Sequence, residues 1–280
     1  MTGGRARIRP PDWLIYAGVV GALAVVALVT TRLGAPPKRS ASLPESTGIP
    51  LAPPSGLDPT VAVDVSGEAR GGGGTAFSVD PRGVWLTARH VVEGCARTVV
   101  IVGPGRGVAA AVRIDPAAET AILTTNGGAP ALSVAPRRIL MRGAIAFSPG
   151  FPRGRPGDTA SRLLRRETLI VRGHGQRREP VLAWIQLRSR LFGGPRTLAG
   201  LSGAPALDSR GRVVGVTIAQ SRRRRLIYVT TPPSLRAALA QAGVSPGTDG
   251  SGPITLDNYH GVGAALRHRL SVARVACLAH

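Results

Sequence analysis

The apolar residues between 61 and 243 come in short runs that turn-forming residues separate. The runs are 61–65, 75–79, 84–87, 98–102, 108–114, 121–124, 144–147, 168–171, 181–187, 213–219 and 226–231. Many short strands with frequent turn signals, such as Asp-Pro-Arg-Gly at 80–83, are typical of antiparallel barrels and sandwiches. The segments between the runs are too short for the crossover helices that parallel strands need. We therefore predict an all-β fold.

One helix is predicted after the last of these runs, at 232–242. Pro233 falls in its first turn, where the missing N–H of proline is tolerated, and Gly243 follows as a stop signal. Leu235 and Leu239 lie on one face, so we expect this helix to pack on the outside of the strands.

The amino-terminal segment has the pattern of a membrane anchor. Residues 13–30 are uncharged and follow three arginines, and this length is about enough to cross a hydrocarbon core as a helix. We predict a cytoplasmic tail at 1–12, a single transmembrane helix at 13–30 and a proline-rich linker at 31–60, with the remainder on the periplasmic or extracytoplasmic side of the cytoplasmic membrane. A cleavable signal peptide is the alternative, because Ala-Leu-Ala at 22–24 resembles a cleavage site, although it lies inside the apolar run.

The charge balance favours no specific nucleic-acid partner. The chain has 36 basic and 15 acidic residues, a formal net charge of +21, and every basic residue except Lys38 is an arginine. Arginine, alanine, glycine and proline enrichment together reflect a biased composition, and 4% aromatic residues leave few platforms for stacking bases. The arginines at 222–225 read as a solvated hairpin loop, with an anionic surface as the alternative.

No metal or cofactor is expected. Cys95 and Cys277 are too few for a four-thiolate zinc site. The other histidines lack the spacing of metal ligands, namely His174, His260, His268 and His280. The two thiols could form a disulfide in an oxidising compartment, and a buried free thiol or an intermolecular bridge stays open.

Two segments carry groups for nucleophilic catalysis. In Gly-Leu-Ser-Gly-Ala-Pro at 200–205, Ser202 can sit on a tight turn with its hydroxyl exposed. The amides of Gly200 and Ser202 can then converge on an oxyanion. His90 follows the run at 84–87, and an imidazole can take a proton from a serine near neutral pH.

These segments, in their order, resemble the trypsin-like (chymotrypsin-fold) serine proteases, and among them the bacterial Deg/HtrA-type branch. The resemblance covers about 61–242. It rests on Gly-Gly-Thr-Ala-Phe-Ser-Val at 73–79, Val-Trp-Leu-Thr-Ala-Arg-His-Val-Val at 84–92, Ala-Ile-Leu at 121–123, Gly-Phe-Pro-Arg-Gly at 150–154, Gly-Leu-Ser-Gly-Ala-Pro at 200–205 and Ile-Tyr-Val-Thr-Thr-Pro at 227–232. It implies two packed six-stranded antiparallel barrels in a protease domain at 61–243. The active site would lie between the barrels, with His90 as general base and Ser202 as nucleophile.

The third member of the triad departs from the family. Where the family has an aspartate before an apolar strand, this chain has Glu119, which carries the same charge on a longer arm. Asp115, four residues earlier, is the alternative acid. We predict that Glu119 orients His90, and a poorly active enzyme follows if it does not.

The resemblance also places Thr217, Ile218 and Ala219 along the substrate-binding strand, which suggests a small or apolar side chain before the cleaved bond. After Gly243, residues 244–280 read as a linker and a C-terminal extension, too short for the PDZ domain that Deg-type proteases often carry.

We therefore predict a membrane-anchored serine endopeptidase that cleaves protein or peptide substrates through an acyl-enzyme. Two alternatives stay open: a pseudoprotease that binds peptides or partners without turnover, and an anionic-surface binder. The natural substrate and the oligomeric state are not readable from the sequence.

Overall fold

The computed structural model describes residues 48–64, 72–115, 118–135, 139–172, 177–191, 197–245, 247 and 250–279. The predicted cytoplasmic tail, the predicted anchor and most of the predicted linker lie outside these residues. Among the described helices, none is long and apolar enough to cross a membrane.

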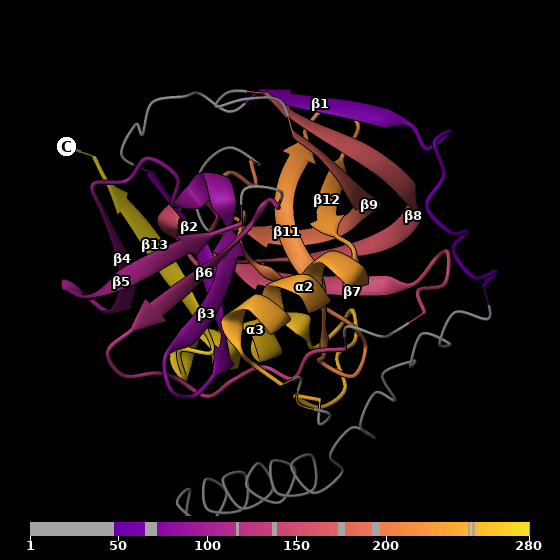
Figure 1. Ribbon diagram of the computed structural model, residues 1–280. Helices are drawn as coiled ribbons and strands as arrows, with labels where there is room; N and C mark the ends of the chain where they lie inside the picture. Colours follow the sequence, from indigo (N-terminus) through magenta and orange to yellow (C-terminus); the bar gives the residue numbers. More distant parts are fainter. Residues whose placement is uncertain are drawn as a thin grey trace, which may run out of the picture. The chain divides into compact units, whose positions relative to one another are not determined.

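Six strands close the first barrel, in the order β13-β2-β3-β6-β5-β4 (Figure 1). Their bounds are β2 (Gly72–Asp80), β3 (Val84–Ala88), β4 (Arg97–Gly103), β5 (Arg106–Ile114), β6 (Thr120–Thr125) and β13 (Val272–Leu278). All neighbours in this ring are antiparallel. Phe77, Leu86, Leu123 and Val275 are buried in it.

The second barrel is a ring in the order β8-β7-β10-β11-β12-β9, which closes because β9 pairs back onto β8. The strands are β7 (Ile145–Gly150), β8 (Gly157–Arg172), β9 (Arg177–Leu191), β10 (Pro205–Leu207), β11 (Val213–Ser221) and β12 (Leu226–Thr230). Leu163, Trp184 and Ile227 belong to its apolar interior. Two six-stranded antiparallel barrels are thus confirmed.

The pairing of two strands differs from the prediction made from the sequence. β1 (Thr60–Asp64), expected as an ordinary barrel strand, pairs in parallel with the second half of β8 and stands outside the ring. β13 comes from the predicted extension at 244–280, yet it pairs with both β2 and β4 and completes the first barrel. The extension is needed because β2 and β4 otherwise present open edges, which a barrel must pair to close.

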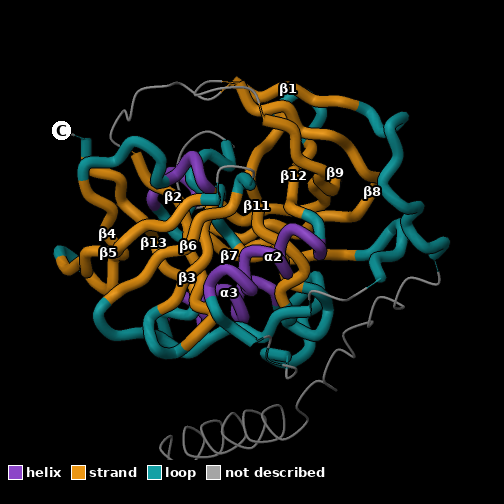
Figure 2. The backbone as a smooth tube through the Cα atoms, in the orientation of Figure 1, coloured by secondary structure: helices purple, strands orange, loops and turns teal. Residues whose placement is uncertain are grey.

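The helices are few beside the strands (Figure 2). The predicted helix is α2 (Pro232–Ala242), which the Thr231 side chain caps and which ends at Gly243 with a φ of 67°. It contacts β6 and β11, one strand from each barrel. A second helix, α3 (Tyr259–His268), packs on β7 and β8 and was not predicted.

Short-range sequence signals fail for α3 because Gly261 and Gly263 lower its helix propensity. Its packing explains Gly263, where any side chain would collide with the Asp158 carboxylate. Arg267 of α3 also donates to both oxygens of Asp158, at 2.6 and 3.1 Å, and so fixes the helix on the second barrel.

Candidate active site

Ser202 lies in the loop that leads into β10, held between the two barrels. The N–H of Gly203 donates to the carbonyl of Thr217 on β11 at 2.7 Å, and the carbonyl of Ser202 accepts from the N–H of Thr75 on β2 at 2.8 Å. Gly200 and Gly203 have φ values of 91° and 87°, which a glycine adopts without the steric cost that other residues carry. The backbone conformation of this loop therefore requires glycine at 200 and 203.

The backbone of the loop leaves two amides unused. Arg153 N–H donates to the carbonyl of Ala199 at 2.6 Å, so the N–H on the other end of that peptide, from Gly200, points the opposite way. Within the described residues, the N–H groups of Gly200 and Ser202 donate no hydrogen bond. These are the two amides that the sequence suggests as an oxyanion hole.

His90 stands in a short 3₁₀ turn, η1 (Arg89–Val91), directly after β3. The N–H of Arg89 donates to the carbonyl of Glu119 at 2.8 Å, which ties this turn to the start of β6. His90 Nδ1 lies 3.6 Å from Glu119 Oε2. This exceeds hydrogen-bond length, and contacts between catalytic groups often shorten only when substrate binds. In the described part of the chain, no hydrogen bond joins His90 to Ser202.

Glu119 is buried just before β6, with 2% of its surface exposed. Arg177, at the start of β9, donates to Glu119 Oε1 through Nε at 3.1 Å and through Nη2 at 2.8 Å. Because both of these bonds use Oε1, the second oxygen, Oε2, faces His90. Burial raises the pKa of Glu119, but the contacts with His90 and Arg177 outweigh it, and the net pKa lies below the ordinary value.

Glu93 links two arginines around this carboxylate. Its Oε1 lies 2.5 Å from Arg89 Nη2, and its Oε2 lies 3.7 Å from Arg177 Nη2. The turn that carries His90 and the strand that carries Arg177 are therefore linked through the Glu93 carboxylate.

Asp115, the alternative triad acid, is engaged elsewhere. Its Oδ2 accepts from Gln241 Nε2 of α2 at 2.7 Å, and its backbone carbonyl accepts from Arg89 Nη1 at 3.1 Å. The carboxylate that lies beside His90 is that of Glu119. This geometry supports Glu119 over Asp115.

A second buried carboxylate supports the backbone of Glu119. Oε2 of Glu179, from β9, accepts the Glu119 N–H at 2.7 Å. Burial raises the pKa of Glu179 to about 7; the Glu119 N–H opposes this rise and the negative charge of Glu119 adds to it.

We expect Glu179→Gln to change how stability depends on pH. The native state keeps the Glu179 proton up to about pH 7, whereas the unfolded chain releases it near the ordinary value of 4.5. The stabilisation is thus complete below pH 4.5 and is lost as the pH rises through 7. Glutamine does not ionise, so the variant does not lose stability in this way. From pH 4 to pH 8, its free energy of unfolding should therefore rise by about 2–3 kcal/mol relative to that of the wild type. Urea unfolding at both pH values measures it, and parallel pH curves for the two proteins would contradict it.

The predicted substrate strand runs beside the nucleophile loop. Thr217 donates its N–H to the carbonyl of Ala204 at 2.9 Å and accepts from Gly203. Ile218 stands at an irregularity in the β11–β12 pairing, and Ala219 follows it half-buried. The structure therefore brings Thr217, the first residue of the predicted substrate strand, to the loop that carries Ser202. Substrate binding along Thr217, Ile218 and Ala219 stays a prediction.

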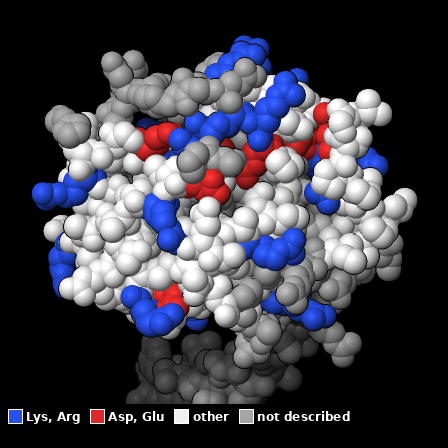
Figure 3. All heavy atoms as spheres, in the orientation of Figure 1, with Lys and Arg blue, Asp and Glu red and all other residues white. Residues whose placement is uncertain are grey.

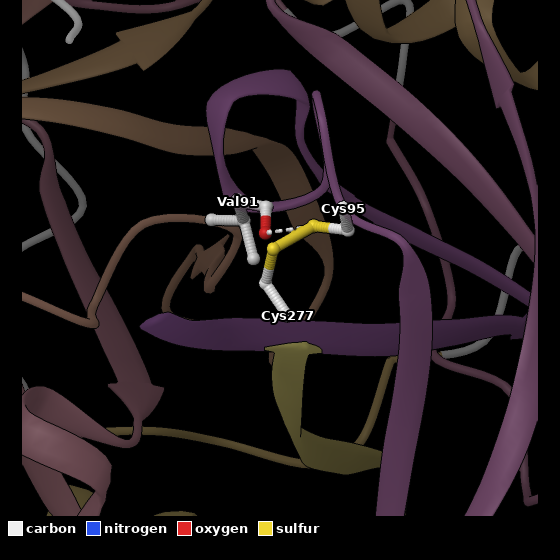
Figure 4. The surroundings of a disulfide bond; sticks show 3 residues. All are labelled: Val91, Cys95 and Cys277. Atoms are coloured by element: carbon white, nitrogen blue, oxygen red, sulfur yellow. Dashed lines mark hydrogen bonds between the residues drawn. A yellow bond between two sulfur atoms is a disulfide. The ribbon is translucent and has the colours of Figure 1, made fainter. Parts of the chain in front are cut away.

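A disulfide joins Cys95 to Cys277, with 5.3 Å between their Cα atoms (Figure 4). Cys95 lies four residues after Val91, whose carbonyl oxygen lies 3.7 Å from Cys95 Sγ. The bond thus fastens β13 to the segment that follows His90. Of the pairings left open by the sequence, the structure has the intramolecular one.

The family model of the trypsin-like peptidase domain matches residues 74–216, about half of the chain, and this span holds His90, Glu119 and Ser202. The chain belongs to the trypsin-like peptidase family. The family predicted from the sequence motifs is thereby confirmed, and the protein is a serine peptidase.

The chain is similar to solved structures of several proteases. An inactive form of Rv3671c from M. tuberculosis H37Rv is 25% identical with a TM-score of 0.48, covering 61% of this chain and 81% of that one. The HtrA-type protease AlgW with a decapeptide is 19% identical with a TM-score of 0.46, covering 61% and 51%. The MamO protease domain from Magnetospirillum magneticum is 18% identical with a TM-score of 0.47, covering 64% and 92%. No curated protein sequence matches the chain.

Two residues of this peptidase site, Arg177 and Glu179, were not predicted from the sequence. Arg177 and Glu179 lie two apart on β9, which placed them on one face of a strand, but nothing local shows that this face meets Glu119.

Proposed function

We propose that this trypsin-like peptidase is an endopeptidase that cleaves protein or peptide substrates through an acyl-enzyme, with Ser202 as nucleophile, His90 as general base and Glu119 as the orienting acid. The observation that carries the proposal is the buried, ionised Glu119 carboxylate, with Oε2 facing His90 Nδ1.

The chemical steps follow from these positions. Ser202 Oγ attacks the carbonyl carbon of the scissile peptide while His90 Nε2 takes its proton. His90 then gives this proton to the leaving amine, which breaks the C–N bond and leaves the acyl group on Ser202. In the second half, a water attacks the ester carbonyl carbon while His90 takes its proton. His90 then gives this proton to Ser202 Oγ as the bond between the acyl carbon and Oγ breaks, which releases the carboxylic acid product and restores Ser202. Glu119 stays ionised throughout and stabilises the imidazolium.

The oxyanion that forms in each half needs preorganised donors. The amides of Gly200 and Ser202 suit this role because neither is used within the described backbone. Donors already fixed in place stabilise a developing charge without reorganising, which is usually a large part of catalysis.

Arg177 acts in this proposal as a positioning residue. A glutamate has one more rotatable bond than an aspartate, so its carboxylate needs more restraint to hold one oxygen at the imidazole. The two hydrogen bonds to Oε1 supply that restraint, which supports Glu119 as a working replacement for the family's aspartate.

A second candidate is a peptide-binding module without turnover. It is favoured by the 3.6 Å separation of His90 and Glu119 and by the lack, among described residues, of a His90–Ser202 hydrogen bond. Turnover that depends on Ser202 separates the two candidates.

We propose further that residues 13–30 anchor the enzyme in the cytoplasmic membrane, with the barrels on the extracytoplasmic side. The support is their uncharged length after a basic tail, together with a disulfide, which persists in oxidising compartments. Carbonate extraction of membranes should leave the full-length chain in the pellet, and release into the supernatant would contradict an integral anchor.

The peptidase activity itself depends on one hydroxyl. We expect Ser202→Ala to lower hydrolysis of an unfolded protein substrate by at least about 1000-fold, because the acyl-enzyme forms on Ser202 Oγ in the proposed mechanism. Ser209→Ala, at an exposed serine on the turn before β11, is the matched control and should retain the wild-type rate. Equal rates for Ser202→Ala and the wild type would refute this assignment.

A further inference from the structure

A cavity of about 1100 Å³ opens beside the nucleophile loop. Its walls are the carboxyl end of β9, Leu198 of the loop, and the hairpin between β11 and β12. Four arginines line it, namely Arg190, Arg222, Arg223 and Arg225, whereas its described lining holds no aspartate or glutamate. The cavity is therefore strongly cationic.

The cavity wall and Ser202 belong to one hydrogen-bonded unit. Gln220, which lines the cavity, accepts the N–H of Leu198 through Oε1 at 3.2 Å. Leu198 in turn accepts the N–H of Leu201, the residue before Ser202, at 2.8 Å. A ligand that contacts this wall thus lies against the loop that carries the nucleophile.

An open strand edge leads from Ser202 to the cavity. β10 pairs with β11 only as far as Val216, and Thr217 makes the last backbone contacts with the nucleophile loop. From Ala219 to Ser221, β11 pairs on the other side with β12, and no described strand pairs with the side that faces β10. An extended peptide can add to such an edge through its backbone. Its chain would then pass from Ser202 toward Gln220 and the arginines.

The arginines that line the cavity determine which chemical groups it can bind. A guanidinium presents a planar fork of N–H donors that matches a carboxylate, and such charge-assisted bonds are stronger than neutral ones. Arg222 and Arg223 are exposed on the hairpin and can adjust to a ligand. We propose that the cavity is a substrate subsite that takes the carboxylate of an Asp or Glu side chain close to the cleaved bond.

This inference rests on the proposed function, since it concerns a substrate of the same site. It adds to the small or apolar side chain expected along Thr217 to Ala219, because the cavity begins only at Gln220. A bilayer is the other anionic partner, but arginines that line a hollow suit an inserted side chain better than a broad lipid surface. Basic side chains also occur elsewhere on the surface (Figure 3), so the control must remove the same charge at another place.

Binding of labelled ten-residue peptides to the full-length Ser202→Ala variant tests the subsite without turnover. One peptide set moves a single Glu along a neutral sequence, and its matched set carries Gln at the same positions. We expect the best Glu peptide to bind at least about 10-fold more tightly than its Gln partner, and this ratio to fall to about 1 in Arg222→Gln/Arg223→Gln. Arg106→Gln/Arg113→Gln, which removes two exposed arginines from β5, should keep the preference.

Three results would overturn the subsite. The first is equal binding of Glu and Gln peptides, and the second is a Glu preference that survives in Arg222→Gln/Arg223→Gln. The third is the absence of a peptide preference together with binding to anionic lipid vesicles that Arg222→Gln/Arg223→Gln abolishes. Failure of the proposed function looks different, because a wild-type chain that binds the Glu peptides with the expected preference but never cleaves them would still have the subsite.

Discussion

Replacement of Glu119 by glutamine is expected to lower kcat/KM by about four orders of magnitude, the cost of losing the orienting carboxylate from a serine protease triad. Glutamine has nearly the same shape, but it cannot stabilise a charged His90, and its amide group can present a donor to the imidazole. The measurement is steady-state hydrolysis of a peptide substrate by the full-length chain at neutral pH.

Asp115→Asn is the matched control, because it removes the same charge from the other candidate acid. Its carboxylate contacts Gln241 of α2, so we expect kcat/KM to change by less than about threefold. Thermal unfolding of each variant separates a lost function from a lost fold, since Arg177 loses one of its charged partners in Glu119→Gln. A folded Glu119→Gln with wild-type activity, or an inactive Asp115→Asn, would assign the triad acid differently.

The second large effect concerns the disulfide. Cys95→Ala/Cys277→Ala is expected to lower the free energy of unfolding by about 4–5 kcal/mol, because the bond closes a loop across 182 positions of sequence. For a domain of this size, a loss of 4–5 kcal/mol lowers Tm by about 10–20 °C. Thermal unfolding of the wild type and the double variant measures the difference.

A reducing agent provides the control for that measurement. Reduction should destabilise the wild type toward the level of the double variant and leave the double variant unchanged. A wild type that unfolds at the same temperature with and without reductant, and at the same temperature as the variant, would show that the Cys95–Cys277 bond does not support the fold.

The sequence predicts a feature of the site when the residues that determine it lie close together in the chain. Ser202 and His90 could be predicted as site residues because each sits in a short motif whose residues also shape the local backbone, as the φ of Gly203 shows. Glu119 was found because it directly precedes an apolar strand. Each of these features is readable within about ten residues.

Contacts between residues far apart in the chain could not be predicted from the sequence. Arg177 reaches Glu119 across 58 positions and Glu179 across 60, through the register in which β9 folds back along β8. β13 is a short alternating run whose partners, β2 and β4, lie far earlier in the chain. The motif at 200–205 and the hairpin at 222–225 could each be identified, but only the fold shows that the cavity lined by the hairpin also touches Leu198, two residues before the motif.

The central claim is that His90 activates Ser202 for nucleophilic attack, and covalent labelling by a fluorophosphonate tests it most directly. Full-length wild type, Ser202→Ala and His90→Ala are treated with the probe, and the modified peptide is identified by mass spectrometry. We expect one phosphonylated residue, Ser202, in the wild type. Labelling should be lost in Ser202→Ala and strongly slowed in His90→Ala. A folded wild type that takes up no probe, or one labelled equally fast without His90, would contradict it.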